Sequence, residues 1–382
     1  MIRCQKDKFS LSDDVTYLNA AYMTPQLKAV EQVGIEALRK KNQPYRITAD
    51  DFFANRNLIK QKFAELISLR SPEQIAIIPS ASYGIANAAR NITLKQDEEI
   101  LMVAEQFPSH VYSWKRLAES YGGVLRTVNP PDTFEHRGEK WNEAILNHIT
   151  DKTAVVALPH VHWADGTLFD LKAIRKKSRE HGALMIIDGT QSVGALPFSI
   201  RELQPDVLIC AGYKWLLGPY SLGLAYYGDS FNEGIPIEEN WINRLNSEDF
   251  KGLTAYQDAF QPGAERYSVG ESSNFNHLPM LLEALEQLLV WKPQMIQQYC
   301  HDISAKAIQT IKESGCFIEE DAFRAKHLFG IYLQPGQEIQ RIKARLDRKN
   351  IYVSYRGEAI RVSPHLYNTP SDFEQLARCF QD

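Results

Sequence analysis

A carboxylate and a lysine each follow an apolar run, and this pairing suggests cofactor chemistry. Asp188 comes directly after the apolar residues 183–187. Because a carboxylate in such a place is poorly solvated, it needs a cation or a hydrogen-bond donor. Lys214 follows the next apolar run, 207–210, and stands between two aromatic residues. Desolvation there would lower the pKa of the lysine, and the neutral amine is the form that makes a Schiff base.

Two further loops carry groups that suit a phosphate and a flat ring. Ser80-Ala81-Ser82 lies between an expected strand and an expected helix, where free N–H groups and hydroxyls form an anion site. Phe107 lies in another loop after a strand and can cover a heteroaromatic ring. Taken singly, the four features are also typical of a helix cap, an ion pair, a snorkelling lysine or a core aromatic residue. Together they are the groups that bind pyridoxal 5′-phosphate.

These residues follow strands in a regular alternation of short apolar runs and amphipathic stretches. The sequence predicts strands at 75–78, 100–104, 124–128, 154–158, 184–187, 207–210 and 223–227. Helices are predicted at 83–90, at 110–121 before Gly122 and Gly123, and from the cap Asp170 to Gly182. The alternation predicts an α/β fold with a mainly parallel sheet covered by helices on both faces. Ligands of such sheets bind beyond the carboxyl ends of the strands.

The pattern changes after about residue 277. A long apolar helix is predicted at 279–291, followed by strands at 329–333, 351–355 and 359–363, a helix at 338–350, and a last helix capped by Ser371. We therefore expect a large domain over residues 15–277 and a small α/β domain over residues 278–382. The N-terminal residues 1–14 are expected to join the small domain.

From Tyr17 to the final helix, the chain resembles the class V aminotransferase family of fold-type I pyridoxal-phosphate enzymes. The most specific pieces are Asp188-Gly189-Thr190-Gln191 and Gly212-Tyr213-Lys214-Trp215-Leu216, the latter with Gly218-Pro219. This group includes cysteine desulfurases, selenocysteine lyases, kynureninases and isopenicillin-N epimerase-like proteins. The resemblance implies a large domain with a seven-stranded, mainly parallel sheet, a smaller C-terminal domain, and pyridoxal 5′-phosphate as cofactor.

The resemblance also implies roles for single residues at the cofactor. Lys214 would form the Schiff base, Asp188 would bind the pyridine nitrogen, and Gln191 the phenolic oxygen. The phosphate would be bound by residues of the first loop and by the aromatic residue before the lysine, and an aromatic side chain would stack on the ring. The phosphate ligands are Ala81 and Ser82, with Ser80 adjacent, and Tyr213; the stacking residue is Phe107.

Further likenesses concern the substrate and a second subunit. Residues 266–274 resemble the segment that reaches the phosphate of the neighbouring subunit, with Ser272 as first and Ser273 as second choice, which implies a homodimer. Residues 360–369 resemble the strand that offers an arginine to the substrate α-carboxylate. Arg361 fits that role because a guanidinium binds a carboxylate through two bonds, and Arg356 is a second candidate. Trp163, where desulfurases have an asparagine, is either a wall of the substrate pocket or a core residue.

One departure from the family bears on the reaction. Desulfurases carry a nucleophilic cysteine shortly before this arginine, and residues 354–359 contain none, so a persulfide mechanism is not expected. We expect an enzyme that acts at the α-carbon of an amino acid, as an aminotransferase, a lyase or an epimerase. Phe107 and Tyr213 favour the kynureninase and epimerase side. The alternatives are a cysteine desulfurase or selenocysteine lyase, a binding protein that keeps the fold without turnover, and a nucleotide-dependent oxidoreductase, which the missing G-x-G-x-x-G motif disfavours.

Composition excludes several other classes. The 382 residues include 43 Lys and Arg against 47 Asp and Glu, a net charge of −4, which gives no general attraction to nucleic acid or to an anionic membrane. No apolar run approaches the ~20 residues that span a bilayer. Five scattered cysteines are typical of reduced thiols in a cytoplasmic protein. His160 and His162 lack a ligand cluster, so no metal is expected. The roles of His110, His162 and Asp165 stay open.

Overall fold

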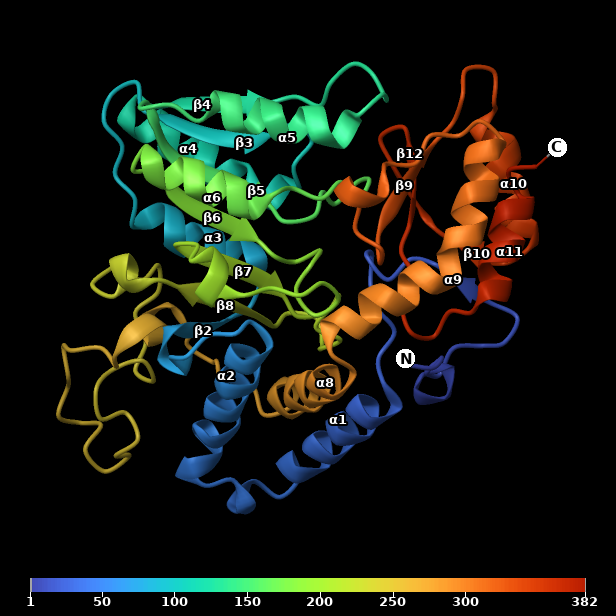
Figure 1. Ribbon diagram of the computed structural model, residues 1–382. Coiled ribbons are helices and arrows are strands. Elements are labelled where there is room, and N and C mark those ends of the chain that lie inside the picture. Colours follow the sequence, from blue (N-terminus) through green and yellow to red (C-terminus); the bar gives the residue numbers. More distant parts are fainter. Residues whose placement is uncertain (1, 382) are drawn as a thin grey trace.

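The computed structural model describes residues 2–381, and a seven-stranded sheet forms its centre (Figure 1). The strand order is β2-β8-β7-β6-β5-β3-β4. Neighbouring strands run parallel from β4 to β7, and β8 is antiparallel to both β7 and β2. This arrangement confirms the predicted α/β fold. The strands are β2 (Ile75–Ile78), β3 (Glu99–Val103), β4 (Val124–Val128), β5 (Thr153–Pro159), β6 (Leu184–Asp188), β7 (Val207–Ala211) and β8 (Gly223–Tyr227).

Helices cover both faces of this sheet because most of its strands carry apolar residues on both sides. In β3, Leu101 and Val103 belong to one buried cluster, whereas Ile100 and Met102 belong to another. This division follows from the alternation of side chains along a strand. The first cluster includes residues of α2 (Ala54–Leu66), α5 (Arg137–His148), α6 (Leu171–Glu180) and α8 (His277–Trp291); the second includes residues of α3 (Ala81–Arg90) and α4 (Tyr112–Tyr121).

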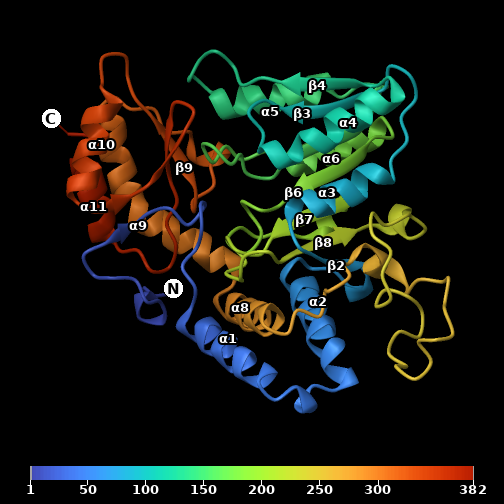
Figure 2. The ribbon, with the colours of Figure 1, turned by 180° about the vertical axis from the view of Figure 1, so that it is seen from behind.

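A second sheet forms the C-terminal part of the molecule. Its three antiparallel strands have the order β11-β12-β9. Figure 2 shows α9 running from the end of α8 towards this sheet, which lies beside the large one. The expected domain boundary between residues 277 and 278 stays a prediction. The elements are α9 (Pro293–Glu313), β9 (Phe329–Tyr332), α10 (Ile339–Arg348), β11 (Ser354–Arg356), β12 (Ala359–Val362) and α11 (Pro370–Arg378).

The N-terminal segment pairs with the C-terminal part. Strand β1 (Thr16–Tyr17) runs parallel to β10 (Ile351–Tyr352). The backbone N–H of Ala20 then donates to the carbonyl of Ser363 at 3.0 Å. From there the chain enters α1 (Lys28–Lys41), which lies beside α8 in both views. Residues 16–20 thus attach the N-terminal segment to the C-terminal part.

Some predicted boundaries differ from the structure. The last helix is capped by Thr369, which forms a capping box with Asp372, so the predicted Ser371 cap is wrong. The predicted strand 351–355 is two strands, because β10 pairs with β1 and β11 pairs with β12. The helix predicted from residue 110 begins at Tyr112, after a 3-10 turn. Within the described residues, none of the helices is long and apolar enough to cross a membrane.

Candidate active site

A cavity of about 260 Å³ lies beyond the carboxyl ends of β5, β6 and β7. Its walls come from four loops that follow strands and from the start of α3. The structure brings the following predicted residues together around it: Ser80, Ala81, Ser82, Phe107, Trp163, Asp188, Gln191, Tyr213 and Lys214.

Asp188 is the last residue of β6 and is held from both sides. Its backbone pairs with Pro159 of β5 and Ile209 of β7. One carboxylate oxygen, Oδ1, accepts a hydrogen bond from the N–H of Thr190 at 2.9 Å. The Thr190 hydroxyl in turn accepts the N–H of Ala211 at 3.1 Å, which joins the ends of β6 and β7. A buried carboxylate is therefore fixed in direction at the cavity wall.

Lys214 lies in a tight loop after β7 and is only 6% exposed. The loop closes through hydrogen bonds from Gly212 N–H to Leu222 O at 2.8 Å and from Gly218 N–H to Gly212 O at 2.9 Å. Burial, together with the positive charge of Arg361, lowers the pKa of Lys214 to about 8, against the opposing effect of Asp188. The loop therefore keeps a reactive, partly neutral amine inside the protein.

The start of α3 supplies an anion site at the same cavity. Ser80 caps the helix, because its Oγ accepts the N–H of Tyr83 at 3.2 Å. The Oγ atoms of Ser80 and Ser82 lie 2.9 Å apart. The first turn of a helix leaves N–H groups without a partner in the helix, and the helix dipole places partial positive charge there. Two hydroxyls and these N–H groups together suit a phosphate.

Phe107 and Trp163 form an aromatic corner at the cavity. Their ring centroids lie 5.4 Å apart with an interplanar angle of 82°. The Nζ atom of Lys214 lies 5.4 Å from the centroid of the Phe107 ring. The indole N–H of Trp163 donates to the carbonyl of Glu105 at 2.6 Å, which fixes the indole to the loop of Phe107. Trp163 is therefore a wall of the pocket.

Arg361 and Arg356 approach the Trp163 wall from the C-terminal sheet. Arg361 is 1% exposed, and its Nη1 donates to the carbonyl of Trp163 at 2.8 Å. Burial and the neighbouring charge of Arg356 lower the pKa of Arg361 to about 9. The guanidinium carbon of Arg356 lies 5.4 Å from the centroid of the Trp163 ring. Both arginines contact a wall of the cavity but are not among its lining residues.

The nitrogen and the oxygen of the Gln191 side-chain amide each form a hydrogen bond. Its Nε2 donates to Ala21 O at 3.1 Å, and its Oε1 accepts the indole N–H of Trp215 at 2.9 Å. One N–H of the amide remains available as a donor, and its expected role at the cofactor oxygen stays a prediction. Ser272 and Ser273, in contrast, do not line this cavity. Ser273 donates to Phe52 O, and the buried Ser272 Oγ has no partner within residues 2–381. Their expected role, towards a second subunit, stays a prediction.

Some residues near the site were missed or left open from the sequence. Tyr220 lines the cavity and contacts Tyr213, with 4.6 Å between ring centroids and an interplanar angle of 53°; its place after the Gly218-Pro219 turn was the available signal. Asp165 is buried behind Trp163 and holds that loop through several partners in distant segments. His110 is also buried, and burial lowers its pKa to about 4. It does not line the cavity.

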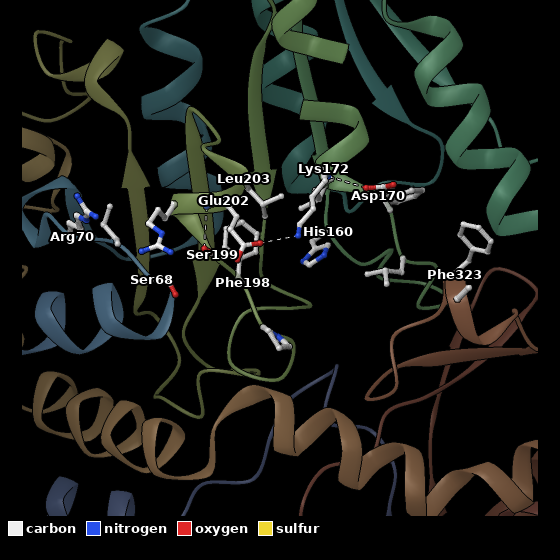
Figure 3. Close-up of a pocket in the computed structure, with 17 residues that line it drawn as sticks. Ser68, Arg70, His160, Asp170, Lys172, Phe198, Ser199, Glu202, Leu203 and Phe323 are labelled. Carbon is white, nitrogen blue, oxygen red and sulfur yellow. Dashed lines mark hydrogen bonds and ion pairs between the residues drawn. The ribbon is translucent and has the colours of Figure 1, made fainter. Parts of the chain in front are cut away.

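A larger cavity, of about 850 Å³, lies among residues 68–70, 168–172 and 197–203, with His160 among its lining residues (Figure 3). Several of its polar groups have partners within the chain: Lys172 pairs with Glu202 at 2.9 Å, Asp170 caps α6, and Ser199 caps α7 (Ile200–Leu203). Its lysine is thus held by an acid, whereas Lys214 of the smaller cavity is in no ion pair among the described residues. Across residues 2–381, no group of three or more His, Cys, Asp or Glu side chains is placed to bind a metal.

Comparisons with known proteins agree with this geometry. The profile of the family "Aminotransferase class-V" matches residues 41–376. The aminotransferase YcbU of Bacillus subtilis, described as uncharacterized, is 25% identical over 82% of this chain and 80% of its own length. The isopenicillin N epimerase of Amycolatopsis lactamdurans is 23% identical over 99% of this chain and 97% of its own.

Solved structures of low sequence identity share the fold. A cysteine desulfurase from Thermococcus onnurineus NA1 superposes with a TM-score of 0.83 at 18% identity, covering 99% of this chain and 97% of its own. The cystine C-S lyase C-DES, in complex with its product cysteine persulfide, has a TM-score of 0.83 at 20% identity, covering 97% of this chain and 98% of its own.

Proposed function

Because this chain belongs to the aminotransferase class-V family and is a pyridoxal-phosphate-dependent enzyme, we propose that it carries out its chemistry in the cavity between α3, Asp188 and Lys214. The substrate is an amino acid, and the reaction takes place at its α-carbon. One observation carries this proposal: an orientated buried carboxylate and a lysine with a pKa of about 8 line the same small cavity from the ends of neighbouring strands.

The residues of the cavity fit the cofactor. Lys214 offers an amine that is neutral in a large fraction of molecules near pH 8, the form that condenses with an aldehyde. Asp188 has a second carboxylate oxygen, Oδ2, for a ring N–H, since Thr190 bonds to Oδ1. The start of α3 suits the phosphate, and Phe107 suits the face of the ring.

Each residue of the site then has its own role in the reaction. The bound cofactor supplies an electron sink for the charge left when the α-proton is removed. Lys214 takes that proton as general base, and Asp188 keeps a proton on the ring nitrogen. Arg361 binds the α-carboxylate with its guanidinium group. Phe107 and Trp163 exclude water from this side of the site.

The thiols of the chain support a reaction other than persulfide transfer. Burial raises the pKa of Cys210, Cys300, Cys316 and Cys379, which disfavours the nucleophilic thiolate. Transamination, elimination and epimerisation remain, and the identity of the product selects among them. The likeness in fold to the cystine C-S lyase C-DES favours elimination as the second candidate after transamination.

The protein is also proposed to be a homodimer and to be located in the cytoplasm. A homodimer is supported by Ser272, whose buried hydroxyl has no partner among residues 2–381, in a segment that resembles the family's intersubunit phosphate contact. A cytoplasmic location is supported by five cysteines that are all free thiols. Sedimentation of the active enzyme tests the first, and cell fractionation tests the second.

The decisive experiment is exchange of the α-proton in D₂O, followed by NMR for a panel of amino acids. The wild-type enzyme exchanges the α-proton of at least one amino acid, and Lys214→Ala does not. Lys95→Ala, at a lysine whose side chain is 90% exposed, is the matched control and keeps the wild-type rate. Exchange by Lys214→Ala at the wild-type rate would refute the proposal. The products formed by the wild type then identify the reaction.

A further inference from the structure

Two arginines share one aromatic wall of the site. The guanidinium carbons of Arg356 and Arg361 lie 5.4 and 6.0 Å from the centroid of the Trp163 ring. Both come from the β11–β12 hairpin, in which Ser354 pairs with Arg361 and Arg356 pairs with Ala359. Because residues 354 and 356 share a face of their strand, Arg361 and Arg356 lie on that same face as diagonal neighbours.

The guanidinium groups of Arg356 and Arg361 have no acidic partner among the described residues. Within residues 2–381, no ion pair includes Arg356 or Arg361. The Nε atoms of both are buried and have no hydrogen-bond partner among these residues. Their remaining bonds go to neutral oxygens: Arg361 to Trp163 O and Ser354 Oγ, and Arg356 to Tyr355 O. Buried unpaired donors of this kind cost free energy unless a ligand meets them.

The charges around the cavity also favour an anionic ligand. Arg356 and Arg361 are cationic, and both lower the pKa of Lys214, so they lie within electrostatic reach of this cavity residue. Asp188 is the acidic residue that lines the cavity. The phosphate site at the start of α3 is built from neutral serines and N–H groups, so it does not need these arginines. A substrate carboxylate that binds Arg361 through both of its oxygens would leave Arg356 without an anion.

We propose that the substrate is an amino acid with an acidic side chain, whose second carboxylate binds Arg356 while its α-carboxylate binds Arg361. This inference rests on the proposed function, because it names the substrate class of the same site. A guanidinium binds a carboxylate through two parallel N–H bonds, and the free Nε of each arginine completes such a pair. Arg356 is thereby assigned to substrate specificity.

The test uses the holoenzyme and isosteric pairs of amino acids. Aspartate is compared with asparagine, and glutamate with glutamine, by titrating the absorbance of the bound cofactor. We expect the better acidic amino acid to bind at least about tenfold more tightly than its amide, because hydrogen bonds between charged groups are stronger than neutral ones. Arg356→Gln should abolish this preference while binding of the amide changes little. Arg341→Gln, an exposed arginine on α10, is the matched control.

A second arm separates this inference from the proposed function. Succinate and glutarate lack the amine, and calorimetry measures their binding to the wild type, to Arg356→Gln and to Arg356→Lys, which keeps the charge but loses the fork. Binding that depends on Arg356, with no amino acid perturbing the cofactor, would refute the proposed function and keep the dicarboxylate site. Amino acids that bind with no acidic preference, or with a preference that Arg356→Gln leaves intact, overturn this inference alone. Binding in neither arm overturns both.

Discussion

Lys214 and Asp188 are buried near each other, yet within residues 2–381 no ion pair contains either side chain. The lysine instead faces the rings of Phe107 and Tyr213, at 5.4 and 5.6 Å from their centroids. An amine that is not held by a carboxylate keeps its lone pair accessible when it loses its proton. Burial and the nearby arginines provide the lowered pKa that makes this loss frequent.

We expect the rate of cofactor uptake by the apo-enzyme to follow the protonation of Lys214. The rate rises with pH and levels off above about pH 8, because only the neutral amine attacks an aldehyde. Arg361→Gln removes a positive charge that favours the neutral amine. The pKa of Lys214 therefore rises, and the midpoint of the profile of rate against pH moves to higher pH. Stopped-flow absorbance of apo-enzyme mixed with pyridoxal phosphate measures both profiles. An identical midpoint in the two proteins would contradict this account.

Single residues of the site could be predicted where the signal is local. Asp188 and Lys214 stand directly after apolar runs, and strands end where such runs end, so their place at the sheet edge followed from the sequence. Asp165 gave no such signal, because its partners Arg137 and Tyr332 lie in distant segments. Likewise, the two partners that fix the amide of Gln191 come from other loops.

At the scale of elements, the start of α3 both caps the helix and borders the cavity, and single substitutions can separate these two functions. Ser80 caps the helix and borders the cavity, whereas Ser82 borders the cavity without capping. Ser80→Ala should lower both the affinity for pyridoxal phosphate and the free energy of unfolding of the apo-enzyme, the latter by about 1 kcal/mol. Ser82→Ala should lower the affinity only. Urea unfolding of the apo-enzymes and cofactor titration decide the matter; equal loss of stability in both variants would disprove this division.

The loop that carries Trp163 is held by a buried charge network around Asp165. The Oδ1 atom of Asp165 lies 3.1 Å from His162 Nδ1. Its Oδ2 atom lies 2.8 Å from both Arg137 Nη2 and the Tyr332 hydroxyl. Since Tyr332 belongs to β9 and Arg137 to α5, the carboxylate joins the C-terminal sheet to the large one. Burial opposes ionisation of Asp165, but its interactions with His162 and Arg137 outweigh this effect and hold the pKa of Asp165 well below the usual range.

Asp165→Asn should therefore destabilise the protein at neutral pH. Breaking a buried ion pair costs on the order of 3–5 kcal/mol because a charge is left without its partner. A carboxyl group with a lowered pKa in the folded protein stabilises it above the pKa of the unfolded chain, about 4, and loses this effect as the pH falls further. Urea unfolding at pH 7 and at pH 3 should show a difference between wild type and variant that shrinks in acid. Asp151→Asn, at a carboxylate that is 96% exposed, serves as the control. A difference that stays constant with pH would show that the charge of Asp165 is not the cause.

Elements were predictable in proportion to their apolar periodicity. The strands of the large sheet are nearly continuous apolar runs, so their positions were expected within one or two residues. Helix α1 was not expected, since most of it is exposed and only Val30 and Gly34 are buried. The division between β10 and β11 depends on which strand each meets, and that information is not local.

At the scale of the whole molecule, the proposed dimer makes a prediction about mixed subunits. Lys214→Ala removes the base from its own site, whereas Ser272→Asp places a charge where the partner's phosphate would bind. Each variant alone should be inactive, but mixing the two after dissociation should restore part of the activity, because one site of each hybrid then holds an intact Lys214 and an intact Ser272. Absence of recovery, with both variants folded by circular dichroism and dimeric by sedimentation, would place Ser272 outside the partner's site.

The pairing of β1 with β10 has a consequence for biosynthesis. Tyr17 leaves the ribosome long before its strand partner, Tyr352, has been translated. At ~5–20 residues per second, the roughly 330 residues between them take about 17–70 s to synthesise. During that time the N-terminal segment has no strand to join and remains open to chaperones and proteases. The β1–β10 pair, whose second strand directly precedes the hairpin of Arg356 and Arg361, thus forms only after residues up to Tyr352 have been made.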